Sequence, residues 1–200
     1  MSTKAMGPSP TGLLLLSTWL PDELHDAFSG WCDDHHRELL TVPGFMRARR
    51  LAFVEGSAAG DDAQFLTMYE TADLAVLSSD PYVEHGRNSG GLPEFLRGKL
   101  RMARLDCELE SATPVDWWSG TAFSEILMIT RPEGAPFPGS GAAATDALPI
   151  TVRSYRASQG PRVRLAESLG DAPAHDAITA SEHWSRWRCV FEESAPAGAF

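Results

Sequence analysis

The chain has 200 residues, 43% of them hydrophobic and 22% charged, which is enough apolar material for one large domain or two small ones. Its formal net charge is -10, with 17 Lys and Arg against 27 Asp and Glu, and this balance argues against nucleic acid or an anionic membrane surface as a partner. No apolar run approaches the roughly 18 residues that cross a bilayer, and no secretory signal is visible. We therefore expect a cytoplasmic protein without membrane contact.

The cysteine pattern agrees with a reducing compartment. Cys32, Cys107 and Cys189 are far apart, form no CxxC pair, and their odd number fits no closed disulfide framework. We expect three small buried hydrophobic side chains.

The first half of the sequence predicts one βαββαβ unit, the ferredoxin-like arrangement. A helix is expected after Pro21, because Asp22 and Glu23 suit a first helical turn, and it should end before the Pro43-Gly44 pair. A second, short helix is expected from residue 73 to 85, broken by Pro81. Strands are expected at 13–20, 45–54, 65–70 and 100–110, and residues 1–11 are expected to be disordered.

The second half repeats the strand pattern of the first. Four short segments of the first half match later segments in the same order, at separations of 111, 104, 97 and 82 positions. The falling separations indicate that the second copy keeps its strands and loses helical residues, and the Ala-, Gly- and Pro-rich stretch 133–149 reads as a loop in place of its first helix. We therefore predict a ferredoxin-like repeat over 12–114 and a degenerate second repeat over 115–200.

This repeat has a physical consequence for the fold. A four-stranded ferredoxin-like sheet covers one face with helices and leaves the other bare, and that bare face must be buried. Two such antiparallel sheets from one chain can pack face to face and enclose a cavity. The expected fold is α+β, a single-chain version of a dimeric α+β barrel, either monomeric or paired as a homodimer through its edge strands.

Several segments resemble a known group of proteins. The stretch Phe28 to His36, the run Val42-Pro43-Gly44-Phe45, the following Ala48-Arg49-Arg50 and the later Met68-Tyr69-Glu70 resemble the EthD-like branch of the dimeric α+β barrel superfamily, over roughly residues 13 to 110. The resemblance implies a pocket between sheets. It also implies any of several chemistries, among them cofactor-free cyclases, isomerases, decarboxylases, dehydratases and monooxygenases, haem enzymes, and proteins without a known reaction.

The candidate catalytic cluster is Asp33, Asp34, His35 and His36 near the end of the first helix. An imidazole can act as acid or base near neutral pH, and a neighbouring carboxylate such as Asp34 can hold its tautomer. Helical periodicity turns His35 inward, onto the stripe of Leu24, Phe28, Trp31 and Leu39. The resemblance instead selects His36, which lies seven residues before Pro43, and we choose His36 as the acid or base.

Arg50 and Tyr69 complete the predicted catalytic set. Adjacent arginines on a strand face opposite sides, so one of Arg49 and Arg50 is expected to stabilise an oxyanion in the cavity. Tyr69 shares one face of its strand with Phe65 and Thr67 and would orient the substrate from the cavity wall. Cys32 stands where the family usually has Tyr, so the resemblance implies no phenol there.

Other side chains are expected to bind substrate. The aromatic residues of the second half, including Trp117 and Trp118, suggest an aromatic-lined cavity. No metal site is expected, because adjacent histidines diverge on a helix and no HExxH or CxxC motif occurs, and no cofactor is expected. The predicted substrate-binding residues are His35, Arg49, Trp31, His85, His183 and Trp184.

These observations lead to one expected function and two alternatives. The leading hypothesis is a small cofactor-independent enzyme of lyase or isomerase type, acting on an oxygenated cyclic or polyketide-like small molecule of secondary metabolism by cyclisation, decarboxylation, dehydration or isomerisation. The alternatives are a non-catalytic protein that binds a small ligand and a cofactor-free monooxygenase. The sequence leaves the substrate open.

Overall fold

The computed structural model describes residues 9–57, 63–89, 91–113, 125–132, 151–168 and 183–195. These residues form eight strands and two α-helices, with short 3-10 turns at Asp22–Leu24, Leu74–Ser78 and Glu94–Leu96. The strands are β1 (Gly12–Trp19), β2 (Phe45–Gly56), β3 (Phe65–Thr71), β4 (Arg101–Thr113), β5 (Glu125–Arg131), β6 (Thr151–Ala157), β7 (Arg162–Ser168) and β8 (His183–Ser194). The helices are α1 (His25–Leu39) and α2 (Asp80–Asn88).

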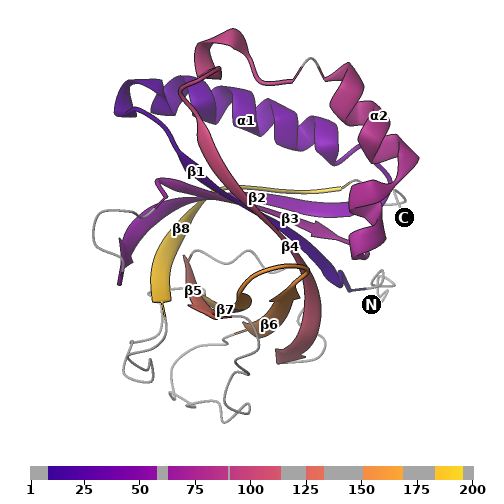
Figure 1. Cartoon of the computed structure of the whole chain (residues 1–200), viewed down its shortest axis with the longest axis vertical. Helices are drawn as coiled ribbons and strands as arrows, with labels where there is room; N and C mark the ends of the chain where they lie inside the picture. Colours follow the sequence, from indigo (N-terminus) through magenta and orange to yellow (C-terminus); the bar gives the residue numbers. More distant parts are fainter. Residues whose placement is uncertain are drawn as a thin grey trace, which may run out of the picture.

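The eight strands close into one antiparallel barrel in the order β1-β3-β2-β8-β5-β7-β6-β4. Figure 1 shows this barrel with α1 and α2 both outside it, on the side of β1 to β4, and with β5, β6 and β7 on the opposite side. Each described strand pairs on both of its sides, so the expected pairing of two copies through free edge strands is wrong for these strands.

The two halves of the barrel have the same strand order. Read around the barrel, the first four strands run β4-β1-β3-β2 and the last four run β8-β5-β7-β6, which is the order 4-1-3-2 in each set. The halves meet where β2 pairs with β8 and where β4 pairs with β6. Because every pair is antiparallel, β1 and β5 run in the same direction along the barrel.

Helix α1 packs on the outer face of the first half. Its buried residues are Phe28, Cys32, His36 and Leu39, at the spacing of one helical face. The expectation that His35 lies in the middle of the buried stripe is therefore wrong, since the buried face passes through His36. The expected stripe included Trp31, which is half-buried at the edge of the buried helix face. Its ring stacks on His35 with ring centroids 5.1 Å apart.

Helix α2 begins beside Pro81, the residue that was expected to break the second helix. Pro81 lies in the first turn of α2, where a missing N–H costs nothing, and the Ser79 side chain caps the helix by accepting a hydrogen bond from the backbone N–H of Tyr82. Before β2, Gly44 has a φ of 91°, so the Pro43-Gly44 turn uses a backbone conformation that favours glycine.

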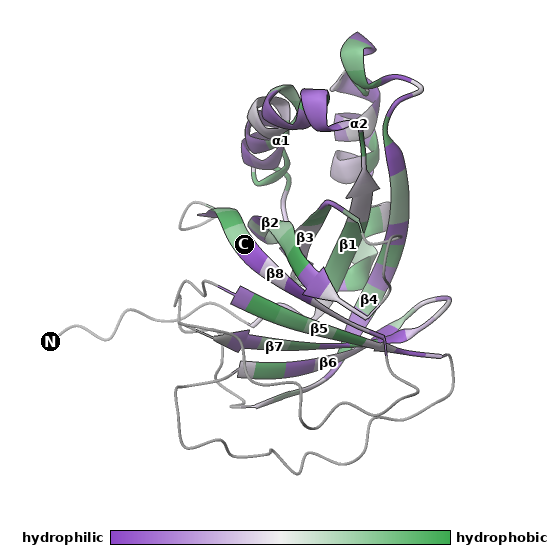
Figure 2. Cartoon of the chain, turned by 90° about the vertical axis from the view of Figure 1, so that its left-hand side faces the viewer, coloured by the Kyte–Doolittle hydropathy of each residue, from purple (hydrophilic) through white to green (hydrophobic). Residues whose placement is uncertain are grey.

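The barrel interior is filled by alternate residues of all eight strands. Figure 2 shows the alternation of apolar and polar colours along the strands. The central layer is apolar and includes Leu15, Leu51, Met68, Ile126, Tyr155 and Leu165. Buried apolar residues on the outer face of the first half, among them Leu14, Phe45, Ala48 and Tyr69, pack with the end of α1 in a separate cluster. The middle of the barrel is thus a packed apolar core, and the residues at its two ends are of different kinds.

Some expectations lie outside the described residues. These are the order of residues 1–8, the loop at 133–149 and the aromatic pair Trp117 and Trp118. Within the described part of the chain, neither helix is long and apolar enough to span a membrane.

Candidate functional site

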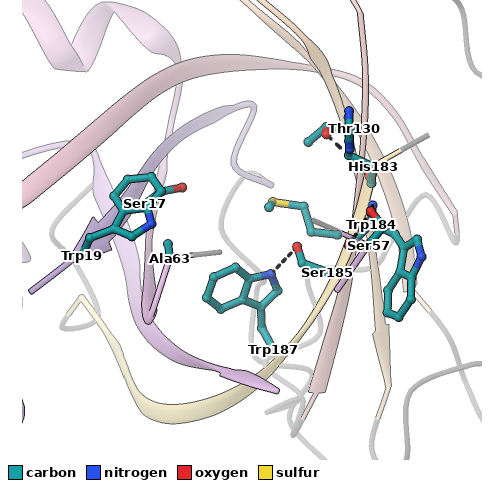
Figure 3. Close-up of a pocket in the computed structure, with 10 residues that line it drawn as sticks. Ser17, Trp19, Ser57, Ala63, Thr130, His183, Trp184, Ser185 and Trp187 are labelled. Atoms are coloured by element: carbon teal, nitrogen blue, oxygen red, sulfur yellow. Dashed lines mark hydrogen bonds between the residues drawn. The ribbon is translucent and has the colours of Figure 1, made fainter. Parts of the chain in front are cut away.

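A cavity of about 160 Å³ lies at the barrel end where β1 and β5 finish and β8 begins. Figure 3 shows Ser17, Trp19 and Ala63 on one side of it, and Thr130, His183, Trp184 and Ser185 on the other. Both halves of the chain therefore contribute walls. The lining residues are Ser17, Trp19, Ser57, Ala63, Met128, Thr130, His183, Trp184, Ser185 and Trp187.

Because side chains alternate between the two faces of a strand, every second residue points into the barrel and toward the cavity. Ser17 and Trp19 continue the inward face that begins with Leu13 and Leu15 on β1. Met128 and Thr130 do the same on β5, two and four residues after the buried Ile126. The inward residues in the middle of the barrel are large and apolar, whereas this end also carries the short hydroxyl side chains Ser17, Thr130 and Ser185.

Indole rings form much of the wall. Trp187 is 2% exposed, and its Nε1–H donates to Ser185 Oγ over 2.7 Å, so the polar atom of the buried ring is satisfied. Its ring packs edge-on against Phe53, with centroids 5.4 Å apart. The guanidinium carbon of Arg101 lies 4.0 Å from the centroid of Trp19, which is cation–π distance. The wall is thus a fixed aromatic surface with a positive charge against one of its rings.

The rim of the cavity is polar. The Ser57 backbone N–H donates to the Trp184 carbonyl over 2.9 Å, and the Trp184 N–H donates to Ser57 Oγ over 3.0 Å, which joins the end of β2 to the start of β8. Thr130 Oγ1 donates to the His183 carbonyl over 3.5 Å. Among the ten described lining residues, His183 carries the single ionisable side chain, and it is exposed to solvent. An imidazole there can give or take a proton.

The opposite end of the barrel interior holds a buried ionic cluster of three arginines and two glutamates. Arg49 NH2 donates to Glu70 Oε1 over 3.0 Å and to Glu167 Oε1 over 2.7 Å. Arg153 NH1 donates to the same Glu70 oxygen over 2.5 Å, and Arg153 NH2 donates to Glu167 Oε1. Arg47 donates two hydrogen bonds to Glu70, from Nε to Oε2 over 2.6 Å and from NH2 to Oε1 over 2.9 Å. All five side chains are at most 3% exposed.

The arginines of this cluster favour the ionised form of Glu70. Burial alone opposes the charged carboxylate of Glu70, but Arg47, Arg153 and Arg49 outweigh it and keep its pKa below the ordinary value. Tyr155, whose hydroxyl lies 2.8 Å from Arg153 NH1, has its pKa raised to about 12 by burial. The cluster lies at the end of the barrel opposite the described cavity, and Arg49 is not among the residues that line that cavity.

His36, the expected acid or base, lies between α1 and the barrel wall. It is fully buried, and its ring contacts Tyr69 and Phe191 at centroid distances of 5.2 Å and 5.1 Å. Burial, then the nearby His35 and the positive charges of Arg50 and Arg37, lowers its pKa to about 3. Cys32 Sγ lies 3.2 Å from His36 Nε2, and burial raises the pKa of that thiol to about 12. Both partners are therefore neutral at neutral pH.

The other predicted catalytic residues lie on the same helix-covered side. Arg50 faces away from the barrel interior and donates to Ser29 Oγ over 2.5 Å and to Asp33 Oδ1 over 2.8 Å, which ties β2 to α1. Tyr69 is 1% exposed, and burial raises its pKa. Asp34 is exposed and pairs with Arg37 over 2.9 Å. None of these side chains lines the described cavity, so their expected catalytic roles stay predictions.

The predicted substrate-binding residues divide into three groups. His183 and Trp184 line the cavity, and Trp31, His35 and His85 belong to the helix layer. Arg49 lies in the buried ionic cluster at the opposite end of the barrel. Sequence reasoning missed Trp19, Ser17, Met128 and Thr130. The signal that identifies them is the alternation on their strands, because each continues a row of inward residues toward the strand end.

Comparisons with known proteins bear on the fold. No protein-family model matches the sequence, and no curated protein matches it. The structure is similar to a solved structure of an anthrone oxidase-like protein, with a TM-score of 0.62 and 12% identity over 94% of each chain.

Two further solved structures are similar over nearly the whole chain. One is a monooxygenase candidate from Fusobacterium nucleatum, with a TM-score of 0.54 and 6% identity over 92% of this chain and 95% of that one. The other is a monooxygenase candidate from Lactobacillus acidophilus, with a TM-score of 0.52 and 8% identity over 92% and 97%. The chain thus shares the α+β barrel fold of these three proteins.

Proposed function

We propose that this protein binds a small, oxygen-bearing ring compound in the barrel cavity and acts on it by proton transfer without a cofactor. The observation that carries the proposal is the cavity itself, in which two indole walls face short hydroxyl side chains and one ionisable group, His183. Aromatic walls favour a flat, apolar guest, and a few placed polar groups orient it.

The size of the cavity limits the guest. A dry cavity of about 150 Å³ in another protein holds benzene, and the cavity here is about 160 Å³. A substituted single ring fits within it, whereas a fused three-ring compound would extend out of the mouth. The substrate class is therefore a one-ring phenol, lactone or quinone precursor, or a larger polyketide-like molecule that enters by one ring.

The residues of the cavity suggest separate roles. His183, at the mouth, would accept a proton from an acidic C–H or O–H of the ring and return it at another position. Ser17 and Thr130 would donate to ring oxygens, and the charge of Arg101 beside Trp19 would favour an anionic intermediate near that wall. Such a transfer leads to isomerisation, dehydration or decarboxylation, the lyase and isomerase chemistries.

A cofactor-free oxygenation is the second candidate, and the names of the similar structures favour it. Removal of a proton from an electron-rich ring methylene gives a carbanion that reduces O2 directly. The balanced reaction converts CH2 and O2 into C=O and H2O, so the substrate supplies all the electrons. This route needs the same base and the same apolar wall as the first candidate.

The discriminating experiment combines a ligand screen with one matched pair of variants and one single variant. One-ring phenols, lactones and hydroquinones are screened by quenching of tryptophan fluorescence, and any ligand found is assayed for turnover with an oxygen electrode in parallel. Ser17→Phe should fill the cavity and abolish binding, whereas the matched change Ser111→Phe, at an exposed position of β4, should not. Equal binding to both variants would overturn the assignment of the cavity.

Turnover then separates the candidates. Loss of turnover with retained binding in His183→Ala supports His183 as the acid or base. Oxygen uptake in step with turnover supports the oxygenation, and turnover without it supports the lyase or isomerase chemistry. Binding without turnover on any compound of the panel would mean that the protein is a ligand carrier.

We also infer that the barrel is built from two ferredoxin-like repeats of the EthD-like type, the second of them degenerate. The equal strand orders support this inference. So do the predicted sequence separations: Arg153 stands 104 positions after Arg49 and Glu167 stands 97 after Glu70, and these four residues meet in one cluster. On this interpretation the boundary falls between residues 114 and 115.

A further inference from the structure

Three metal-binding side chains come together in the helix layer, outside the barrel. His35 and Glu38 stand three residues apart on one face of α1, and His85 comes from α2. Each offers one potential ligand atom, and the three atoms lie within 4.8 Å of one another. The two imidazole rings are 5.8 Å apart between centroids and inclined by 35°.

The surroundings of the two histidines favour coordination. The Nε2 atom of His85 is buried and has no hydrogen-bond partner among the described residues, so it is an unsatisfied polar atom that points to a missing partner. The ring of His35 stacks on Trp31 with an interplanar angle of 10°, which fixes the plane of the imidazole.

We propose that His35, Glu38 and His85 bind one divalent transition-metal ion of the Zn²⁺ type and thereby clamp α1 to α2. Two imidazoles and one carboxylate are a three-ligand set that leaves a fourth position for water or an external ligand. Mg²⁺ and Ca²⁺ are disfavoured, because they prefer oxygen ligands. This site is separate from the barrel cavity and does not depend on the function proposed for it.

The geometry needs only a modest adjustment. Bonds of about 2.0–2.1 Å to a tetrahedral ion place ligand atoms about 3.3 Å apart, against separations of up to 4.8 Å here. Rotation of the exposed Glu38 side chain and a small shift of α2 toward α1 would close the difference. Metal binding should therefore draw the two helices together and raise the melting temperature.

The test uses the full chain with any purification tag of histidines removed. Co²⁺ is added first, because four-coordinate Co²⁺ gives visible absorption bands, and Zn²⁺ should then displace it at one equivalent. In His85→Ala and in Glu38→Ala, both the metal affinity and the metal-dependent rise in melting temperature should fall. The affinity should fall by at least about 100-fold in His85→Ala, since loss of a residue that only supports a metal ligand already costs about 10–100-fold.

Two controls keep the result interpretable. Glu38 is exposed, so Glu38→Ala should fold normally even if a histidine variant does not. His25→Ala removes a histidine of α1 outside the proposed set and should leave Co²⁺ affinity unchanged. Absence of Co²⁺ and Zn²⁺ binding to the unaltered chain, or binding that Glu38→Ala and His85→Ala leave unchanged, would overturn the proposal.

Discussion

Arg49 and Arg153 meet inside the barrel, where each guanidinium donates to the same two carboxylates, those of Glu70 and Glu167. Arg49 and Glu70 come from the first half of the chain, and Arg153 and Glu167 from the second. The cluster is fully buried, so it joins the two halves through contacts that water cannot replace. Removal of one member leaves the others charged in a low-dielectric interior.

Glu167→Gln should therefore be strongly destabilising. The change removes one of the two carboxylates that Arg49 and Arg153 share, and loss of one partner from a buried ion pair typically costs about 3–5 kcal/mol. Urea unfolding of both proteins measures the difference in the free energy of unfolding. The exposed pair Arg104 and Asp106 gives the matched comparison, because Asp106→Asn should cost less than about 1 kcal/mol. Equal effects of the two changes would show that the cluster is not a buried ionic network.

Much of the fold follows from the sequence, because strand alternation and turn residues are local signals. The strands at 13–20, 45–54, 65–70 and 100–110 were predicted within three residues of β1 to β4. Pro81 was misjudged, because a proline ends a helix or begins one depending on the cap before it, here Ser79. The identical strand order of the two halves agrees with the predicted repeat, while the repeat itself stays a prediction.

The site was harder to predict, because burial of a helix face depends on the element it meets. Trp31 and His36 illustrate this: hydrophobicity puts Trp31 inward, whereas the barrel wall accepts His36, which has Cys32 and Tyr69 as neighbours. In the barrel interior, too, the surroundings of a side chain depend on residues far away in the sequence. Arg49 was expected to bind substrate, and its NH2 group donates to Glu167, 118 positions away. His183 and Trp184 reach the predicted kind of cavity because they begin β8 at its rim.

The buried His36 should make the protein less stable in mild acid. Its folded pKa of about 3 lies below the ordinary histidine value of 6.5, so as the pH falls below about 6.5 the unfolded chain binds a proton that the folded chain does not. The contribution of the neutral His36 to the free energy of unfolding is fully present above that pH. It declines toward pH 3, by up to about 1.4 kcal/mol per pH unit. Between pH 6.5 and 4.5 the histidines dominate this loss; Glu70, whose folded pKa is also lowered, adds to it below about pH 4.3.

The variant that checks this is His36→Leu, measured by urea unfolding at several pH values. Its stability should fall less steeply between pH 6.5 and 4.5 than that of the unaltered chain, with a residual slope from His35, whose pKa is also lowered. His183→Leu removes an exposed imidazole and should keep the original slope. An unchanged slope in His36→Leu would contradict the assignment of the buried neutral ring.

An exchange of two interior residues tests the inferred repeat. Leu51 and Tyr155 hold equivalent places in the two halves, two residues after Arg49 and Arg153, and both are buried in the same apolar cluster. Leu51→Tyr alone overfills the core, at about 1–3 kcal/mol, and Tyr155→Leu alone leaves a void and removes the hydroxyl beside Arg153. If the halves are equivalent, the double variant should be more stable than the sum of the two losses predicts, because the new hydroxyl would lie beside Arg49. A strictly additive double variant would count against equivalence.

Two glycines of the first half should respond to alanine with opposite signs. Gly44 has a φ of 91°, and a Cβ there would lie 2.5 Å from a methyl carbon of Val76. Gly44→Ala should therefore destabilise the protein by more than about 1 kcal/mol, through backbone strain and the displaced valine. Gly30 lies within α1 with open space where its Cβ would be, so Gly30→Ala should stabilise by about 0.5–1 kcal/mol. Thermal and urea unfolding of both variants measure the two effects, and a gain in stability from Gly44→Ala would contradict the turn geometry that leads from α1 into β2.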